Sequence, residues 1–372
     1  MTQSRLRRLA FALAAPVATV LFAVGFSSIV LLLFGSNPLE AYADMFGHAA
    51  KLETQIGMLN RATPLYLSGV AVAIGFKMNL FNIGVEGQYI FAFIVAAAAG
   101  AAVNLPGALH VIFIFAVAMA VGGAYSGIAG VLKVTRGVNE VISTIMLNII
   151  AISGLVAWLI TRWQAGGELV TGRRVGTEPI ADSGLLPGLN GLLELLGREI
   201  RAGTELTAVL IVAIAVGIGY SILLNRTVFG YDLRASGMNP FAARAGGIPP
   251  KRMVVIAMVL SGAVAGLVAM PELMKTGFFP ANPIRLLGFA GIAVALVGRN
   301  HPVGIGLAAL VFAFLDVSSG ILQITGAASR EIVVIMQGVI ILVAVVTYEV
   351  VGRIREREES AAAAAALAGG AT

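Results

Sequence analysis

The chain of 372 residues is 58% hydrophobic and only 12% charged, with a mean hydropathy of +0.93. Soluble domains carry roughly 25% charged residues, so this chain has too little polar surface for a water-soluble fold, and we expect a polytopic membrane protein. The absence of cysteine excludes disulfides and thiolate metal sites, and three scattered histidines argue against a metal centre. We attribute the net charge of +6 to basic residues at span ends rather than to nucleic-acid binding.

The chain starts with a basic stretch that contains Arg5, Arg7 and Arg8, followed by an apolar run over 9–34. This run is much longer than the roughly 7–15 apolar residues of a signal peptide. We therefore expect an uncleaved first membrane span.

Ten segments are candidates for membrane spans, because a helix needs about 20 mostly apolar residues to cross the hydrocarbon. Two of them, 61–76 and 285–298, are short. The ten expected spans are 9–34, 61–76, 80–103, 108–132, 141–162, 206–224, 252–270, 285–298, 303–322 and 331–351.

The distribution of basic residues predicts the orientation. If the N-terminus is cytoplasmic, the inner segments hold 15 of the 25 Lys and Arg residues, as the positive-inside rule requires. Ten spans then place the C-terminus and the tail 353–372 in the cytoplasm, and the long loop 164–205 outside. We expect a single transmembrane domain over 1–372, with its second half at 206–351 and a cytoplasmic loop at 225–251.

Five spans lie on each side of the 164–205 loop. An odd number of spans per half makes the halves antiparallel, as in the inverted repeats of many transporters. The pair Gly84 and Gly87 in the third span also matches Gly288 and Gly291 in the eighth. We therefore expect two five-helix halves related as an inverted repeat; a chance coincidence of glycine pairs is the alternative.

The stretch LFNIGVEGQYIF, residues 80–91, places Asn82, Glu86 and Gln88 in a very apolar region. A charged residue at the bilayer centre costs roughly 2.5–3.5 kcal/mol, so Glu86 must be near an interface, paired, or beside a wet cavity. One interpretation is a broken helix that lines a translocation path. The other is the polar loop of a tight hairpin with Asn82 as a helix N-cap.

Two further polar groups lie in or near spans. Asn139 and Glu140 are explained by capping at the start of the fifth span, whereas Asn148 lies deeper in it. Asp316 in the ninth span is a functional candidate as an intramembrane carboxylate. We favour a position for Asp316 near the outer end of the span, hydrogen-bonded to neighbouring serines.

The inner loop 225–251 contains the signature of a short helix. Asn239 suits an N-cap, Pro240 suits the first helical position, and Gly246 or Gly247 suits the stop, which predicts a helix over 240–245. A helix of this length is unstable alone, so it needs a docking surface. The alternative is a solvated connector.

Three motifs together, LFNIGVEGQ, GVNEVISTIMLN and TVFGYDLRASGMNPFAARAGGI, resemble permease subunits of ABC importers for nucleosides and simple sugars. These belong to a wider permease family that also serves branched-chain amino acids and ribose, and the resemblance covers 60–350. It implies a second related permease subunit, cytoplasmic ABC ATPase subunits that bind ATP and Mg, an extracytoplasmic substrate-binding protein, and the bacterial inner membrane. It also implies a substrate pathway at Asn82, Glu86, Gln88 and Asn148, and ATPase coupling by Gly237, Asn239, Pro240, Ala242, Ala243 and Gly247.

The expected function is transport of a nucleoside by alternating access, because GVNEVISTIMLN is most similar to the longer of two nucleoside-importer permeases. A simple sugar or a branched-chain amino acid is the alternative cargo. An ion-coupled secondary transporter, with Glu86 or Asp316 carrying protons, is the alternative from another class. We expect no enzyme activity, ATP site or cofactor in this chain, because it has no G-x-x-x-x-G-K-[ST] motif and no catalytic constellation.

Overall fold

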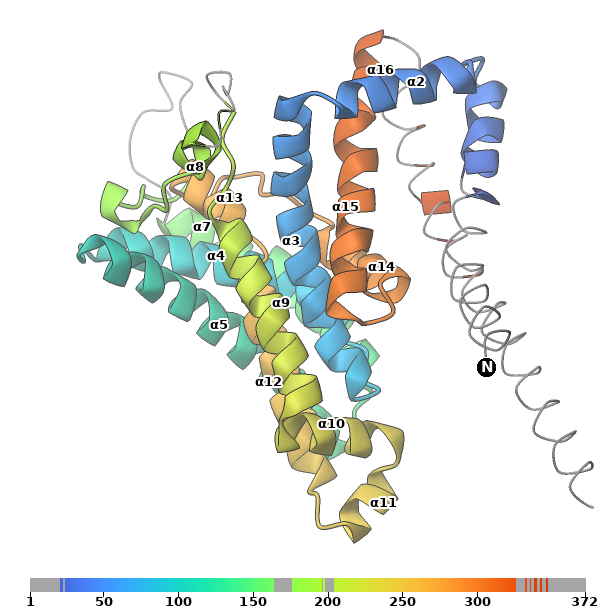
Figure 1. The fold of residues 1–372 in the computed structure, drawn as a ribbon. Coiled ribbons are helices and arrows are strands. Elements are labelled where there is room, and N and C mark those ends of the chain that lie inside the picture. Colours follow the sequence, from blue (N-terminus) through green and yellow to red (C-terminus); the bar gives the residue numbers. More distant parts are fainter. Residues whose placement is uncertain are drawn as a thin grey trace, which may run out of the picture. The chain divides into compact units, whose positions relative to one another are not determined.

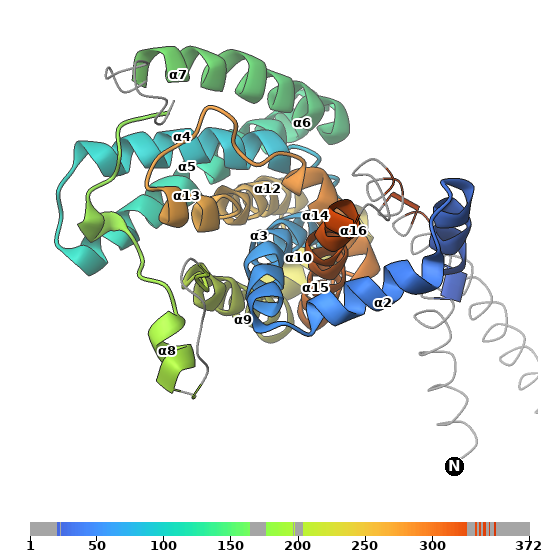
Figure 2. The ribbon, with the colours of Figure 1, turned by 90° about the horizontal axis from the view of Figure 1, so that it is seen from above.

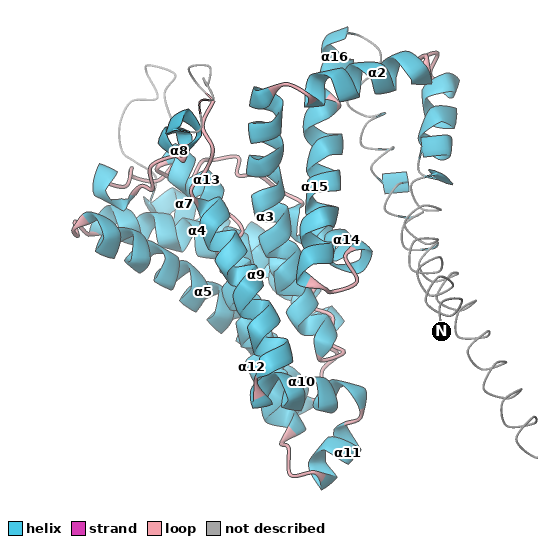
Figure 3. Ribbon diagram, in the orientation of Figure 1, coloured by secondary structure: helices cyan, strands magenta, loops and turns pink. Residues whose placement is uncertain are grey.

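The computed structural model describes residues 21–22, 24–163, 176–195, 197 and 204–325, with isolated positions between 332 and 346. In these ranges the regular structure is helical (Figure 3), apart from one isolated bridge between Gly176 and Pro280. The expected all-α class is confirmed.

The chain forms two compact units, one of residues 1–51 with 314–372 and one of residues 52–313. In the first unit, the helical segment Val24–Leu33 and helix α2 (Pro38–Ala49) meet at an angle of 118°. Asn37 caps α2 by accepting a hydrogen bond from Leu39 N, with Pro38 at the first position. The core of this unit comprises Val30, Leu31, Ala41, Met45, Leu322 and Ile332.

The second unit is a helix bundle in which α3 (Leu52–Lys77) packs against α9, α12 and α14 (Figures 1 and 2). Helices α10 and α11 lie at one end of this bundle, and α8 and α13 lie at the other (Figure 1). Its elements after α3 are α4 (Val85–Ala102), α5 (Gly107–Arg136), α6 (Glu140–Ile149), the π-helix η1 (Ile150–Val156), α7 (Ala157–Trp163), the 3-10 turn η2 (Asp182–Gly184), α8 (Asn190–Leu195), α9 (Val209–Arg226), α10 (Val228–Met238), α11 (Pro240–Ala245), α12 (Pro250–Gly266), α13 (Met270–Thr276), α14 (Leu287–Val297) and α15 (Pro302–Ser318). The last helix leaves this unit after Ala313 and is followed by α16 (Gly320–Thr325) of the first unit.

Six helical segments in the described ranges are long and apolar enough to cross a membrane, or seven if the bent pair near the N-terminus is one span. The chain is therefore a multi-pass membrane protein. Helix α14 has 11 residues and is about 16 Å long, half of a hydrocarbon core of about 30 Å. The six segments are Val85–Ala102, Gly107–Arg136, Glu140–Trp163, Val209–Arg226, Pro250–Thr276 and Pro302–Thr325.

The expected short span at 61–76 is part of a longer helix, α3, which starts at Leu52. Its first turns contain Glu53, Gln55 and Asn60, which lower the hydropathy but do not interrupt a helix. The hydropathy pattern therefore underestimated the length of this helix. The expected span at 331–351 lies almost entirely outside the described residues.

Helices α5 and α12 cross with their backbones in close approach. A Cβ atom on Gly122 would lie 2.3 Å from the carbonyl oxygen of Gly262, and one on Gly266 would lie 2.1 Å from that of Ala118. Only glycine permits this separation, as at many helix crossings in membranes. The crossing brings Ser261 of α12 to the polar residues at the start of α4.

Candidate functional site

The turn between α3 and α4 places the polar residues of LFNIGVEGQYIF inside the protein. Helix α3 ends at Lys77 and α4 begins after Gly84. Asn82, Glu86 and Gln88 are only 1%, 3% and 1% exposed. These three side chains therefore need hydrogen-bond partners within the protein.

Asn82 and Gln88 form a reciprocal amide pair. Asn82 Nδ2 donates to Gln88 Oε1 at 3.0 Å, and Gln88 Nε2 donates to Asn82 Oδ1 at 2.9 Å. Asn82 also donates to Ser261 Oγ at 2.8 Å and accepts from Gly84 N at 3.0 Å. Ser261 in turn donates to Ala71 O at 2.6 Å, so this network joins α3, the turn, α4 and α12.

Glu86 holds the N-terminal end of α14. Its Oε1 atom accepts from Leu286 N at 2.6 Å and from the hydroxyl of Tyr89 at 2.9 Å, and its Oε2 atom accepts from Gly288 N at 2.8 Å. The Tyr89 hydroxyl also lies 2.8 Å from Ile284 O. A carboxylate in this position satisfies helix N–H groups that have no partner in their own helix and complements the helix dipole.

The glycines of the two Gly-x-x-Gly motifs lie at close helix contacts, and one of them, Gly288, approaches the first motif. A Cβ atom on Gly288 would lie 2.4 Å from Glu86 N, and one on Gly291 would lie 1.9 Å from Ser68 Oγ. On the other side of α4, a Cβ on Gly87 would lie 2.8 Å from Asn148 Oδ1. These glycines therefore allow the first turn of α4 to contact both α14 and α6.

Asn148 of α6 binds the backbone on either side of the start of α4. Its Oδ1 atom accepts from Gly87 N at 2.8 Å, and its Nδ2 atom donates to Ile83 O at 2.8 Å. The structure thus gathers all four residues expected in the substrate pathway, Asn82, Glu86, Gln88 and Asn148, around the first turn of α4. Their contact with a substrate stays a prediction.

Two members of this site, Tyr89 and Ser261, were missed by the sequence analysis. Tyr89 follows Glu86 by three residues, a spacing at which helical side chains meet. Ser261 is a polar residue beside Gly262 in an apolar helix, a combination that favours contact with another helix. Both signals were present in the sequence.

The capping interpretation of the second polar cluster is confirmed. Asn139 Oδ1 accepts from Val141 N at 2.8 Å at the start of α6. Glu140 accepts from Lys133 Nζ at 2.5 Å.

In the first unit, Ser319 Oγ donates to the backbone oxygen of Asp316 at 3.1 Å.

The predicted helix over 240–245 is α11. Asn239 Oδ1 accepts from Phe241 N and Ala242 N, both at 3.0 Å, and Pro240 takes the first helical position. The helix stops at Gly246, and Gly247 follows with a φ of +84°. A left-handed conformation of this kind favours glycine.

The two alanines of α11 that are expected to couple to an ATPase differ in their exposure. Ala242 is exposed, whereas Ala243 is buried. The sequence analysis missed two large apolar side chains beside them, Met238 and Phe241, which are 88% and 86% exposed. Exposed apolar side chains of this size are typical of an interaction surface when they are grouped.

Gly237, the remaining coupling candidate, touches the α3–α4 turn. A Cβ atom on Gly237 would lie 2.8 Å from Met78 Cα and 2.9 Å from Lys77 O. The end of α10 therefore rests on the backbone four residues before Asn82. This contact links the α10–α11 segment to the polar network.

Residues 55–345 match the family described as "Branched-chain amino acid transport system / permease component". The chain is 32% identical over 331 residues to the glucose ABC transporter permease protein TsgB13 of Haloferax volcanii, covering 88% of this chain and 85% of that protein. It is 30% identical over 348 residues to the guanosine ABC transporter permease protein NupP of Bacillus subtilis, covering 92% and 96%. It is 29% identical over 335 residues to the nucleoside ABC transporter permease protein NupB of Lactococcus lactis subsp. cremoris, covering 89% and 90%.

Proposed function

The chain belongs to the family of permease components of branched-chain amino acid transport systems, and we propose that it is the permease subunit of an ATP-driven nucleoside importer. Nucleosides are favoured because NupP and NupB carry guanosine and nucleoside in their names and align over nearly their whole lengths. The contact of Gly237 with the α3–α4 turn is the observation that carries the mechanism. It connects an exposed helix pair to the polar residues inside the bundle.

The importer that we propose has further subunits. Two cytoplasmic ABC ATPase subunits hold ATP and Mg, a second related permease completes the membrane part, and an extracytoplasmic binding protein delivers the cargo. The exposed residues Met238, Phe241 and Ala242 support an ATPase interface at α10 and α11. This chain itself supplies no ATP site and no cofactor in the proposed mechanism.

In the proposed mechanism, ATPase closure moves α10 and α11 as a unit. Gly237 transmits the movement to Met78, and the turn transmits it to Asn82 and the start of α4. Because Glu86 joins α4 to the end of α14, the two helices shift together. The result is alternating access to a pathway beside the first turn of α4.

The polar residues of the pathway are already bonded within the chain. Asn82 and Gln88 bond to each other, and Asn148 donates to the backbone oxygen of Ile83, all at 3.0 Å or less. To touch a nucleoside they must exchange these partners, since buried polar groups are costly without one. Contact with cargo therefore accompanies a rearrangement of α4.

We place the protein in the bacterial inner membrane with ten spans and both termini in the cytoplasm. The six apolar helical segments support several membrane crossings, and the distribution of Lys and Arg supports cytoplasmic termini. The proposal includes two five-helix halves related as an inverted repeat. The close approach of Gly288 in the short helix α14 to Glu86 in α4 supports this proposal, because it brings together the two segments that carry the Gly-x-x-Gly pairs.

Uptake of radiolabelled guanosine by cells with and without the gene tests the function. We expect uptake to be lost on deletion, restored by the intact gene, and abolished when the partner ATPase is inactivated. A simple sugar is the second candidate cargo, because the relative TsgB13 is named for glucose. Deletion that abolishes glucose uptake and spares guanosine uptake would establish that second candidate instead.

A further inference from the structure

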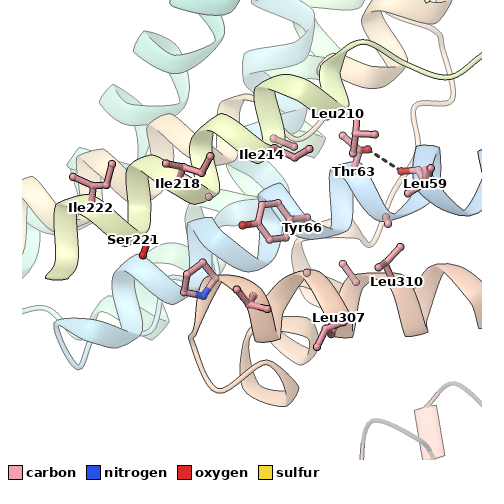
Figure 4. A pocket seen from close by; sticks show the side chains of 17 residues that line it. Leu59, Thr63, Tyr66, Leu210, Ile214, Ile218, Ser221, Ile222, Leu307 and Leu310 are labelled. Carbon is pink, nitrogen blue, oxygen red and sulfur yellow. Dashed lines mark hydrogen bonds between the residues drawn. The ribbon is translucent and has the colours of Figure 1, made fainter. Parts of the chain in front are cut away.

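An open groove runs along the side of the bundle between α3, α9 and α15 (Figure 4), with a cavity volume of about 560 Å³. Tyr66 of α3 forms its floor. Glycines face this ring from both sides: a Cβ atom on Gly217 would lie 1.8 Å from the Tyr66 hydroxyl, and one on Gly306 would lie 3.6 Å from the ring. The Tyr66 hydroxyl can therefore lie against α9 only because position 217 is glycine.

The walls of the groove are aliphatic. On α9, Leu210, Ile214, Ile218 and Ile222 recur every four residues and so form one row along the helix (Figure 4). The polar groups in the lining are hydroxyls, and that of Thr63 donates to Leu59 O at 2.8 Å. The facing wall on α15 is formed by Val303, Gly306, Leu307 and Leu310.

The row on α9 is long enough for one acyl chain, although it extends past the middle of this span. From Leu210 to Ile222 the row on α9 extends about 18 Å at 1.5 Å per residue. One half of the hydrocarbon core is about 15 Å thick. Helix α9 is itself one of the candidate spans, so the row lies at membrane depth.

Basic residues lie close in sequence to the residues that line one end of the groove, Ile222 and Pro302. Arg226 follows Ile222 by four residues and therefore continues the same row at the end of α9. The Tyr220 hydroxyl donates to Asn300 O at 2.9 Å, which fixes this end of α9 to the turn before α15. That turn carries the exposed residues Arg299 and His301.

We propose that this groove binds one anionic phospholipid, with an acyl chain along the aliphatic row and the phosphate at Arg226. Long apolar walls ending in a cation are complementary to such a lipid. A nucleoside or a sugar fits poorly, because most of its hydroxyls would face aliphatic walls and only the few hydroxyls of the lining could bind them. The inference requires only that the chain spans a membrane, so it stands whatever the transported solute is.

A photoreactive phosphatidylglycerol with a diazirine on its acyl chain tests the proposal. The full-length chain, purified in the complex in which it occurs in its own membrane, is labelled and the labelled residues are identified. We expect labels on α9 and α15 residues of the groove. Excess unlabelled phosphatidylglycerol should compete several times better than phosphatidylcholine.

Matched variants on α9 test the location. Ile218 and Ile211 are both 56% exposed, but only Ile218 lines the groove. Ile218→Trp should fill the groove and abolish the labelling, whereas Ile211→Trp should leave it unchanged. Equal labelling of the two variants, or attachment of a photoreactive residue at position 214 to a polypeptide instead of a lipid, would overturn the proposal.

A second pair tests the headgroup contact. Arg226→Gln should reduce the preference for phosphatidylglycerol over phosphatidylcholine about fivefold, the factor expected for one basic residue near an anionic lipid surface. Arg136→Gln removes an exposed arginine at the end of another candidate span, α5, and should not change that preference. A preference that is the same in both variants would contradict the role of Arg226.

Discussion

Replacing Glu86 with glutamine should loosen the contact between α4 and α14. The carboxylate accepts hydrogen bonds from Leu286 N at one oxygen and from Gly288 N at the other. A glutamine has only one oxygen, so its NH₂ group must face one of these two N–H donors. In either orientation a buried N–H group loses its acceptor.

The loss of stability in Glu86→Gln can be estimated from the hydrogen bond that is lost between residue 86 and α14. A hydrogen bond to a charged group contributes about 1.5–3 kcal/mol, and a buried donor without an acceptor costs a similar amount. Because Glu86 is only 3% exposed, water cannot replace the missing partner without entering the bundle. We therefore expect Glu86→Gln to lower the free energy of unfolding by about 1.5–3 kcal/mol.

Thermal unfolding of the purified protein in detergent measures this change. Glu53→Gln is the control, because Glu53 is exposed in the first turn of α3 and should tolerate the change. Tyr89→Phe should have a smaller effect, since Glu86 keeps both backbone donors. If Glu86→Gln unfolds at the same temperature as the Glu53 control, the interpretation of Glu86 as the residue that holds α14 is wrong.

Three further changes test other contacts. Gly288→Ala should destabilise the protein by about 1–3 kcal/mol through overpacking. Gly219→Ala is the control, because the Cβ position of Gly219 faces open space. Equal unfolding temperatures of the two variants would contradict the close approach of Gly288 to Glu86. Asn239→Ala should lower nucleoside uptake, because it removes a helix cap worth about 0.5–2 kcal/mol. Asn239→Asp can still cap α11 and should retain uptake. Loss of uptake in both variants would contradict the capping role. Ala242→Glu should abolish uptake without altering the unfolding temperature, because Ala242 is exposed; unchanged uptake would remove it from the ATPase interface.

Helix α11 could be predicted from the sequence because its signals are local. The cap Asn239, Pro240 and the stop at Gly246 and Gly247 lie within nine residues of each other, and each acts on its own backbone. The turn before α4 was predicted less well. The helix begins after Gly84 rather than at residue 80, and Asn82, expected as its N-cap, accepts from Gly84 N and does not cap α4. A helix cap or a helix stop acts on backbone groups of its own turn, so its signal lies in neighbouring residues of the sequence.

The contacts of Glu86 could not be predicted in this way. The carboxylate of Glu86 accepts from the N–H groups of Leu286 and Gly288, which are 200 and 202 residues away in the sequence. No local sequence pattern specifies a contact between residues so far apart. The residues alone therefore left a broken helix and a hairpin loop as equal interpretations, and the family resemblance favoured the broken helix. The structure shows no tight hairpin: α3 and α4 make few contacts with each other. The turn between them is buried, and its polar groups form hydrogen bonds to other helices.

ATP-dependent uptake by the reconstituted importer tests the central claim most directly. Vesicles that contain this chain, its partner permease and its ATPase subunits, with the binding protein added outside, are given radiolabelled guanosine. We predict accumulation against a concentration gradient only when ATP is present on the ATPase side. Accumulation driven by a proton gradient in the absence of ATP would contradict an ATP-driven importer.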